Sequence, residues 1–403
     1  MSRLGLAVLI GSTLACGVDG TVFVPRDLER ADEEVPGPVI LPGSEPAPPS
    51  VLEVFSGQAH ACALASGVAL CWGKNAGGAL GTDDTTDHDA PTRVAGGLVF
   101  DALAAGRAHT CGLERGSGRV LCWGSGGEGQ LGQGDTADRR APVAVPLPAP
   151  ATRVSTSYDH TCALLADGSL HCWGKNDEHQ LGLGDTEPRL TPARVGADSD
   201  WINVAAGQGH TCGLRRPGTL WCWGRNTDGQ LGLGSPSASA IRVITPAVVG
   251  TRSDWRRLDL GQNASVGITS DGGLYWWGRV NGLLPGASAI PFSPARVDLR
   301  SDWIDVSTDT LHTCGRTLSN QLFCWGRNVE GQLGLDDGID RDTPTAVVHP
   351  AARWTAVSVG RFFTCAVSET RVLSCTGRMP NEERFSTFTP FVLPPDLDPA
   401  RLP

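Results

Sequence analysis

Cysteine is the residue type whose number and spacing most clearly imply chemistry in this 403-residue chain. Twelve of its 13 cysteines fall into six close pairs, in which eight to ten residues separate the two members. Such a separation suits two facing strands joined by a turn, which brings the two sulfur atoms within disulfide reach. We therefore predict six disulfides, which join Cys62 and Cys71, Cys111 and Cys122, Cys162 and Cys172, Cys212 and Cys222, Cys314 and Cys324, and Cys365 and Cys375.

The alternative is that these cysteines are reduced, buried thiols that act as small apolar side chains. One repeat of the chain argues against it, because Val266 and Trp276 replace both members of its pair together. The spacing is also far from that of structural zinc sites. Since disulfides form in oxidising compartments, the pairs predict an exported protein.

Histidine also recurs at one place in the repeats, where converging imidazoles would suit metal binding or proton transfer. Repeats that are arranged around an axis keep such side chains apart, so no three of them converge on one ion. We therefore expect a packing and hydrogen-bonding role for His60, His109, His160, His210 and His312.

Acidic residues follow a Gly-Gln-Leu-Gly turn in most repeats, and one such group consists of Asp336, Asp337, Asp340 and Asp342. Their carboxylates are ligands that calcium accepts, but the ordered spacing of known calcium loops is absent, and we expect the aspartates to cap their own turns. No Ser/His/Asp, Cys/His or phosphate-binding motif stands out. We predict no catalytic residue, no metal site and no cofactor, and hence a protein that is not an enzyme.

A repeat of about 50 residues must position all of these side chains. Each copy holds four short apolar segments separated by Gly, Asn, Asp or Pro, and their two-residue alternation predicts strands. The seven copies begin at Val51, Phe100, Ala151, Trp201, Trp255, Trp303 and Trp354.

Four strands per copy and seven copies predict an all-β, seven-bladed β-propeller with four short strands per blade. The ring would cover residues 51–394, and a C-terminal tail would follow at 395–403. An open β-solenoid is the alternative, but it fits poorly because neither terminal repeat looks like a polar capping unit.

The repeat motif itself has a known counterpart. The fourth copy contains AGQGHTCGL and LWCWGRNTDGQLG within 206–232, and four other copies are similarly regular, whereas those at 260–286 and 359–378 are worn. This pattern resembles the repeat of the RCC1-like (regulator of chromosome condensation) family. The resemblance covers most of the chain and implies the same seven-bladed propeller.

Family membership does not by itself fix function. The namesake of the family is a nuclear exchange factor that docks on nucleosomes, and another member is a secreted bacterial inhibitor of β-lactamases. Nucleosome or DNA docking needs a basic surface, whereas this chain has a net charge of −10 and no basic arm. We therefore expect a protein partner, no nucleic acid, and a monomeric ring.

The N-terminus predicts export and anchoring. Arg3 precedes an apolar run that ends before Cys16, and Thr13-Leu14-Ala15-Cys16 resembles a bacterial lipobox, although leucine is usual in place of Thr13. We predict a signal peptide at 1–15, a lipidated Cys16, a proline-rich acidic linker at 16–50 and an outer-membrane lipoprotein that faces the periplasm or the cell surface. An ordinary signal cleaved near Ala15 is the alternative, and residues 39–42 could instead add a strand to the last blade.

The fifth repeat departs most from the pattern and is the predicted partner-binding surface. Its candidate residues are Tyr275, Trp276, Leu283, Leu284 and Phe292, which have the composition of interface hot spots. The alternative is that this repeat decayed and repacked, with Trp276 filling the space of the disulfide. The predicted function is thus a surface-tethered, non-enzymatic propeller that binds a protein, and the other candidates are a carbohydrate or matrix adhesin and an enzyme that uses the central funnel.

Overall fold

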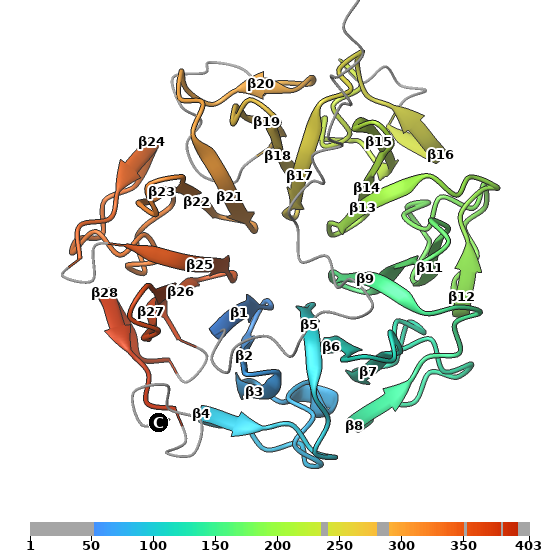
Figure 1. Ribbon diagram of the computed structural model, residues 1–403, viewed down its shortest axis with the longest axis horizontal. Helices are drawn as coiled ribbons and strands as arrows, with labels where there is room; N and C mark the ends of the chain where they lie inside the picture. The colour runs from blue at the N-terminus through green and yellow to red at the C-terminus, as the bar shows by residue number, and fades with distance from the viewer. Residues whose placement is uncertain (1–51, 235–240, 280–289, 350–352, 380–381, 394–403) are drawn as a thin grey trace, which may run out of the picture. The chain divides into compact units, whose positions relative to one another are not determined.

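The computed structural model describes residues 52–234, 241–279, 290–349, 353–379 and 382–393. They form seven four-stranded antiparallel sheets around a common axis (Figure 1). Each sheet consists of four consecutive strands from one repeat, which we call a blade. The prediction of an all-β, seven-bladed propeller is therefore confirmed.

The strands occupy equivalent places in every blade. The innermost are β1 (Leu52–Ser56), β5 (Phe100–Ala105), β9 (Ala151–Thr156), β13 (Trp201–Ala206), β17 (Trp255–Leu260), β21 (Trp303–Thr308) and β25 (Trp354–Val359). The second are β2 (His60–Ala65), β6 (His109–Glu114), β10 (His160–Leu165), β14 (His210–Arg215), β18 (Ala264–Thr269), β22 (His312–Thr317) and β26 (Phe363–Ser368).

The third strands are β3 (Val68–Gly73), β7 (Val120–Gly124), β11 (Leu170–Gly174), β15 (Thr219–Arg225), β19 (Leu274–Gly278), β23 (Leu322–Gly326) and β27 (Leu373–Arg378). The outermost are β4 (His88–Arg93), β8 (Arg139–Ala144), β12 (Arg189–Arg194), β16 (Arg242–Val248), β20 (Ala295–Arg296), β24 (Arg341–Ala346) and β28 (Arg384–Pro390). A short 3-10 turn, η1 (Ala76–Gly78), follows β3. No helix in the described part of the chain is long and apolar enough to cross a bilayer.

Six disulfides join the second and third strands of six blades, and the two cysteines of each lie directly opposite each other in the register. They are Cys62 with Cys71, Cys111 with Cys122, Cys162 with Cys172, Cys212 with Cys222, Cys314 with Cys324, and Cys365 with Cys375. All twelve cysteines are fully buried. In the fifth blade Val266 takes the place of the first cysteine and lies opposite Trp276. The predicted pairing is confirmed, and it indicates an exported or extracellular protein.

Tryptophans from the third strands fill the wedges between blades. Trp223 is fully buried, contacts the ring of Trp201 and donates from Nε1 to the carbonyl of Gln180 in the preceding blade at 2.9 Å. The last glycine of the Gly-Gln-Leu-Gly turn makes room for such an indole at Gly132 and Gly232, whereas Gly334 faces the ring of Phe388. Gly132 has a φ of +70°, and a Cβ there would lie 2.8 Å from Trp173 Nε1. The repeat motif is therefore a packing motif between neighbouring blades.

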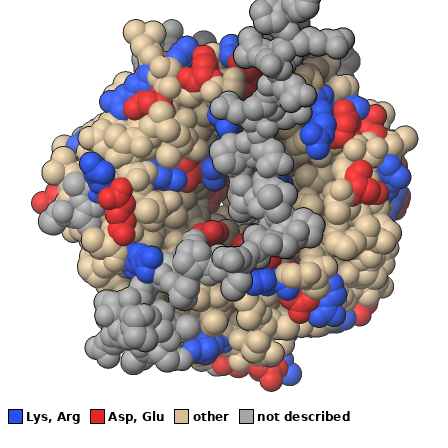
Figure 2. Space-filling model, in the orientation of Figure 1, with Lys and Arg blue, Asp and Glu red and all other residues tan. Residues whose placement is uncertain are grey.

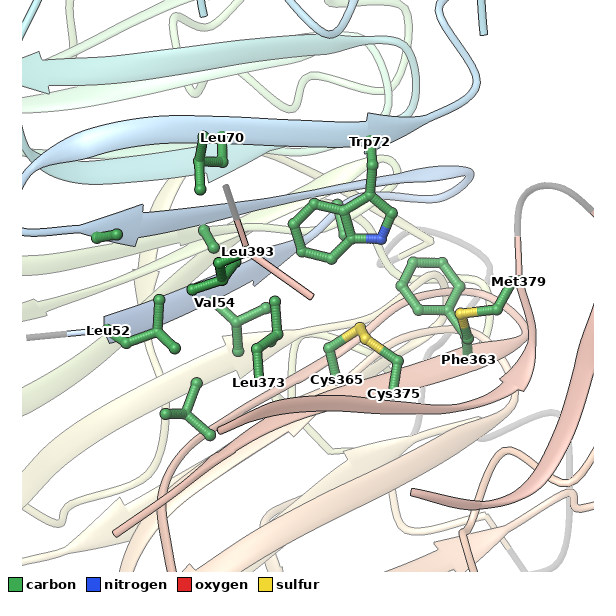
Figure 3. Close-up of a cluster of buried hydrophobic side chains, with 14 residues drawn as sticks. Leu52, Val54, Leu70, Trp72, Phe363, Cys365, Leu373, Cys375, Met379 and Leu393 are labelled. Carbon is green, nitrogen blue, oxygen red and sulfur yellow. A yellow bond between two sulfur atoms is a disulfide. The ribbon is translucent and has the colours of Figure 1, made fainter. Parts of the chain in front are cut away.

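The ring closes by contacts between the first and last blades, which share no strand in the described residues. Ser56 N donates to Ser358 Oγ at 2.8 Å, and Ser56 Oγ donates to the Ser358 carbonyl at 3.2 Å. Leu393 lies in the same buried cluster as Trp72 of the first blade (Figure 3). We call this junction the seam. The last blade has four strands of its own, and residues 39–42, the alternative source of a strand, lie outside the described residues.

The disulfides give a first testable prediction. Replacing Cys212 and Cys222 together by alanine is expected to lower the free energy of unfolding by about 2–3 kcal/mol, because the unfolded chain regains the entropy of a loop of about ten residues. Urea denaturation under oxidising conditions measures this difference. As a control, dithiothreitol should leave the folded wild-type protein oxidised, since all twelve sulfurs are buried. Rapid reduction without unfolding would contradict this picture.

Candidate functional site

The five repeated histidines form hydrogen bonds between adjacent blades. In each, Nε2 lies 2.7–3.0 Å from a hydroxyl oxygen at the start of the second strand of the next blade. That hydroxyl in turn donates to a backbone carbonyl of the blade that carries the histidine. The imidazole must therefore carry its proton on Nε2 and donate it. The pairs are His60 with Thr110, His109 with Thr161, His160 with Thr211, His210 with Ser265, and His312 with Thr364.

This geometry makes the histidines structural. All five are at most 1% exposed, and burial lowers the pKa of His60 and His160 to about 4 and that of His109, His210 and His312 to about 3. These histidines are neutral at physiological pH. Their pKa values lie too far below that pH for them to take up and release protons there.

Ala264 and Phe363 take the histidine's place at the two remaining junctions. Those junctions keep hydrogen bonds nearer the axis, of a kind that also occurs at junctions with a histidine, such as the bond from Ala206 N to Ser155 Oγ. Between the fifth and sixth blades, Asp259 Oδ2 accepts from Thr308 N at 2.7 Å. At the seam, Ser358 Oγ accepts from Ser56 N.

The predicted partner surface of the fifth blade is not supported as one cluster. Trp276 is 6% exposed and packs in the core with Val266 and Trp303, so its place in that surface is corrected: it fills the space of the missing disulfide. Tyr275 is half-buried against Trp255. Phe292 instead lies over Gly229 of the preceding blade, and Leu283 and Leu284 lie outside the described residues.

The acidic loops are engaged with their own turns. Asp337 Oδ1 accepts from Ile339 N at 3.0 Å, and Arg341 donates to its Oδ2 at 2.6 Å. Asp185 makes the same contacts with Glu187 N and Arg189. Within the described residues, no group of three His, Cys, Asp or Glu side chains is placed to hold a metal ion.

A small pocket of about 170 Å³ opens at the seam. Phe363 and Met379 form its buried apolar wall, and Phe362 is half-buried beside them. The guanidinium groups of Arg361 and Arg378 lie 5.1 and 4.3 Å from the centre of the Phe362 ring. We call it the seam pocket.

The worn seventh repeat carries the sequence that builds the seam pocket. Arg361-Phe362-Phe363 stands where regular copies carry two residues and the histidine. In addition, Ala61 replaces the hydroxyl residue that would face that histidine. The binding surface predicted from the sequence lies in the fifth repeat and does not include this pocket. The signal was available, because histidine and threonine are lost together at the same junction and are replaced by apolar groups.

A second cavity, of about 210 Å³, lies on the axis of the ring. The last residue of every innermost strand lines it, from Ser56 in the first blade to Val359 in the last. Tyr158 lines it too and reaches across the axis, since Gln58 Nε2 donates to its hydroxyl at 3.0 Å and Thr310 Oγ1 lies 3.2 Å from the same oxygen. We call it the axial cavity. Figure 2 shows acidic side chains within the central hollow of the face it presents.

The Tyr158 contacts form a directed relay. Thr310 Oγ1 donates to Asp309 Oδ1 at 2.9 Å, so the tyrosine hydroxyl must donate to Thr310 while it accepts from Gln58. The relay joins the first, third and sixth blades across the axis.

Removing that hydroxyl is expected to loosen the relay. Tyr158→Phe should lower the free energy of unfolding by about 1–2 kcal/mol and speed amide hydrogen exchange in the loops around Gln58 and Thr310. Tyr275→Phe is the matched control, since among the described residues its hydroxyl has a hydrogen bond only with Arg252, at 3.2 Å, away from the axis. If amide hydrogen exchange in both loops is the same in Tyr158→Phe as in the wild type, the relay does not stabilise these loops.

Solved propellers share this fold. The crystal structure of human WBSCR16 matches with a TM-score of 0.70 and 20% identity over 79% of this chain and 88% of that one. Yeast RCC1 (Prp20), in its complex with Kap60, matches with a TM-score of 0.71 and 19% identity over 85% of both chains. At this identity the likeness establishes the architecture alone.

Sequence comparisons point to the same family. The chain is 32% identical over 158 residues to human "Probable E3 ubiquitin-protein ligase HERC3" and 34% identical over 103 residues to the Arabidopsis thaliana "Ultraviolet-B receptor UVR8". These matches cover 38% and 25% of this chain but only 14% and 23% of those proteins. The family model of the RCC1-like domain matches residues 10–289, and that of the RCC1 repeat matches 319–367. This chain therefore belongs to the RCC1-like domain family.

Proposed function

We propose that this protein is an exported, lipid-anchored propeller that binds a protein partner through the seam pocket. The observation that carries the proposal is the coincidence of an apolar pocket with the junction where the repeat's histidine–hydroxyl pair is replaced. A buried apolar wall beside an aromatic ring and two arginines has the composition of an interface hot spot.

The charges around the seam pocket suggest the chemistry of the partner. Lys74 and Arg378 are ion-paired, with Asp87 at 2.9 Å and Glu382 at 3.2 Å. Arg361 is exposed and makes no ion pair with any described residue, so it offers a cation for an incoming carboxylate. The pocket therefore suits a partner segment in which an apolar side chain lies next to an acidic one.

Export and anchoring rest on the cysteines. Six buried disulfides suit an oxidising compartment, which supports an exported location. Cys16 is the one cysteine outside the pairs and lies outside the described residues. Its lipidation and an outer-membrane location remain proposals. Metabolic labelling with a fatty-acid analogue tests them: the label should appear on the wild-type protein and be absent from Cys16→Ala.

The binding proposal is tested with full-length protein and three variants. Cross-linking and capture from an envelope extract should enrich one protein with the wild type, and Phe362→Ala and Arg361→Glu should each reduce that enrichment at least tenfold. Arg107→Glu is the matched control, because Arg107 holds the equivalent exposed place in the second repeat. Equal enrichment by all four proteins, or no enrichment by any, would overturn the seam pocket as the binding site.

A further inference from the structure

The axial cavity has the lining of a ligand site and is separate from the seam pocket's apolar wall. Ser155, Thr156, Ser307 and Ser358 line it with hydroxyl groups, and Asp259 and Asp309 line it with carboxyl groups. Arg107 also lines it, but its guanidinium group is ion-paired with Asp159 at 2.9 Å. At about 30 Å³ per molecule, its volume of about 210 Å³ holds roughly seven waters, so it has room for a small organic molecule.

The two carboxyl groups have no cation of their own. Among the ion pairs of the described residues, none involves Asp259 or Asp309. Asp259 accepts hydrogen bonds from Thr308 N and the Ser307 hydroxyl, and Asp309 accepts from Thr310. Burial raises the pKa of Asp259 to about 7 and that of Asp309 to about 6, even though these hydrogen bonds and the more distant Arg361 favour the charged forms. A buried carboxylate without a counter-charge is costly, and a cation in the cavity would relieve that cost.

We propose that the axial cavity binds a small organic molecule that carries a primary ammonium group. An ammonium group donates three hydrogen bonds and carries a positive charge, which matches a lining of carboxylate and hydroxyl acceptors. A divalent metal ion fits less well, because calcium takes six to eight oxygen ligands with several carboxylates among them, and no cluster of that kind lies in the described residues. A neutral diol would leave both carboxyl groups without a counter-charge.

Titration calorimetry on the full-length protein separates these ligands. Ethanolamine is the probe, ethylene glycol is its uncharged counterpart of the same size, and calcium chloride supplies the metal ion. We expect ethanolamine to bind at least tenfold more tightly than ethylene glycol, and calcium to give no comparable binding. Equal affinities for the two organic probes, binding of calcium alone, or no heat of binding with ethanolamine would each overturn the proposal.

Variants then locate the bound molecule. Asp259→Asn and Asp309→Asn should each weaken ethanolamine binding at least tenfold, whereas Asp89→Asn, an exposed aspartate on β4, should leave it unchanged. Because Asp259 also holds a blade junction, Asp309→Asn is the variant that decides the location. Unchanged affinity in Asp309→Asn would place the ethanolamine elsewhere. Phe362→Ala should not affect it, so this proposal and the seam pocket can fail separately.

Discussion

Acidification from pH 6 to pH 4 is expected to lower the free energy of unfolding by about 4 kcal/mol per pH unit. The five buried histidines have folded-state pKa values of about 3–4, below the value of 6.5 for an unfolded chain. Their neutral forms therefore stabilise the fold fully above pH 6.5, and this stabilisation is lost as the pH falls towards 4. Each histidine contributes about 1.4 kcal/mol per pH unit in that window.

Carboxyl groups with raised pKa values act in the opposite direction, and those with the largest shifts are Asp259 and Asp309, while burial also raises the pKa of Glu53. The folded-state pKa values of Asp259 and Asp309, about 7 and 6, lie above that of an unfolded aspartate, so acidification stabilises the folded form at these sites. Five histidines less two aspartates leave a net uptake of about three protons on unfolding, which gives the slope of about 4 kcal/mol per pH unit. Nδ1 of His109, His160, His210 and His312 is buried with no hydrogen-bond partner in the described part of the chain, so a proton added there would find no acceptor among those residues.

A pair of residues already present at another junction suggests a variant that tests how a buried histidine affects the acid dependence of the free energy of unfolding. The double substitution His312→Phe and Thr364→Ala copies the pair Phe363 and Ala61 that the seam already uses. It should cost about 1–3 kcal/mol at pH 7, because one buried hydrogen-bonded pair is lost, and it should reduce the acid slope by about 1.4 kcal/mol per pH unit. Urea denaturation at half-unit steps from pH 4 to pH 7 measures both quantities. A slope equal to that of the wild type would mean that His312 does not titrate on unfolding.

The double substitution Phe391→Ala and Leu393→Ala is expected to open the ring at the seam. Leu393 is buried beside the first blade, and the Phe391 ring centre lies 5.6 Å from that of Trp72. Truncating both side chains should cost about 5 kcal/mol or more, since each large-to-alanine change in a core costs about 2–5 kcal/mol. No peptide link joins these two blades directly, so the lost contacts leave little to hold the junction.

The matched control is the double substitution Val145→Ala and Leu147→Ala at the junction of the second and third blades. Those side chains pack in the same buried cluster as Trp173, but the chain itself continues into the next blade there. Hydrogen exchange should therefore accelerate across β1 and β28 in the seam variant and much less across β8 and β9 in the control. Similar acceleration at both junctions would show that the seam is no weaker than the others.

The sequence predicts the repeated part of this structure well. Periodic segments establish four strands per blade and seven blades, and the joint loss of cysteines at Val266 and Trp276 correctly indicated a disulfide in each of the six remaining blades. Both signals are local, because paired strands are neighbours in the chain. Local sequence does not distinguish the two roles of Trp276. A tryptophan in an altered repeat can lie at the surface and bind a partner, or it can fill space in the core, and the burial of Trp276 shows the second role.

The axial cavity and the seam pocket could not be located in this way. The repeat pattern says which residues are equivalent, but not which of them meet across the axis: Tyr158 contacts residues 100 and 152 positions away. The side chains that line the two cavities also differ between equivalent positions of the repeats, so they leave no periodic pattern in the sequence. The seam joins the two ends of the ring, and the sequence offers no motif for a contact between Ser56 and Ser358.

The separate blades also determine how the ring would respond to mechanical load. A pulling force on the N-terminal segment enters at β1, whose contacts with the last blade are hydrogen bonds and apolar packing alone. The seam would therefore yield first, and once the first blade unravels to Cys62, its bond to Cys71 would carry the force past residues 63–70 and keep them from extending. Each following disulfide shortens the length that can be drawn out of its blade. The fifth blade lacks this limit, so under sustained tension it would extend further than the other six.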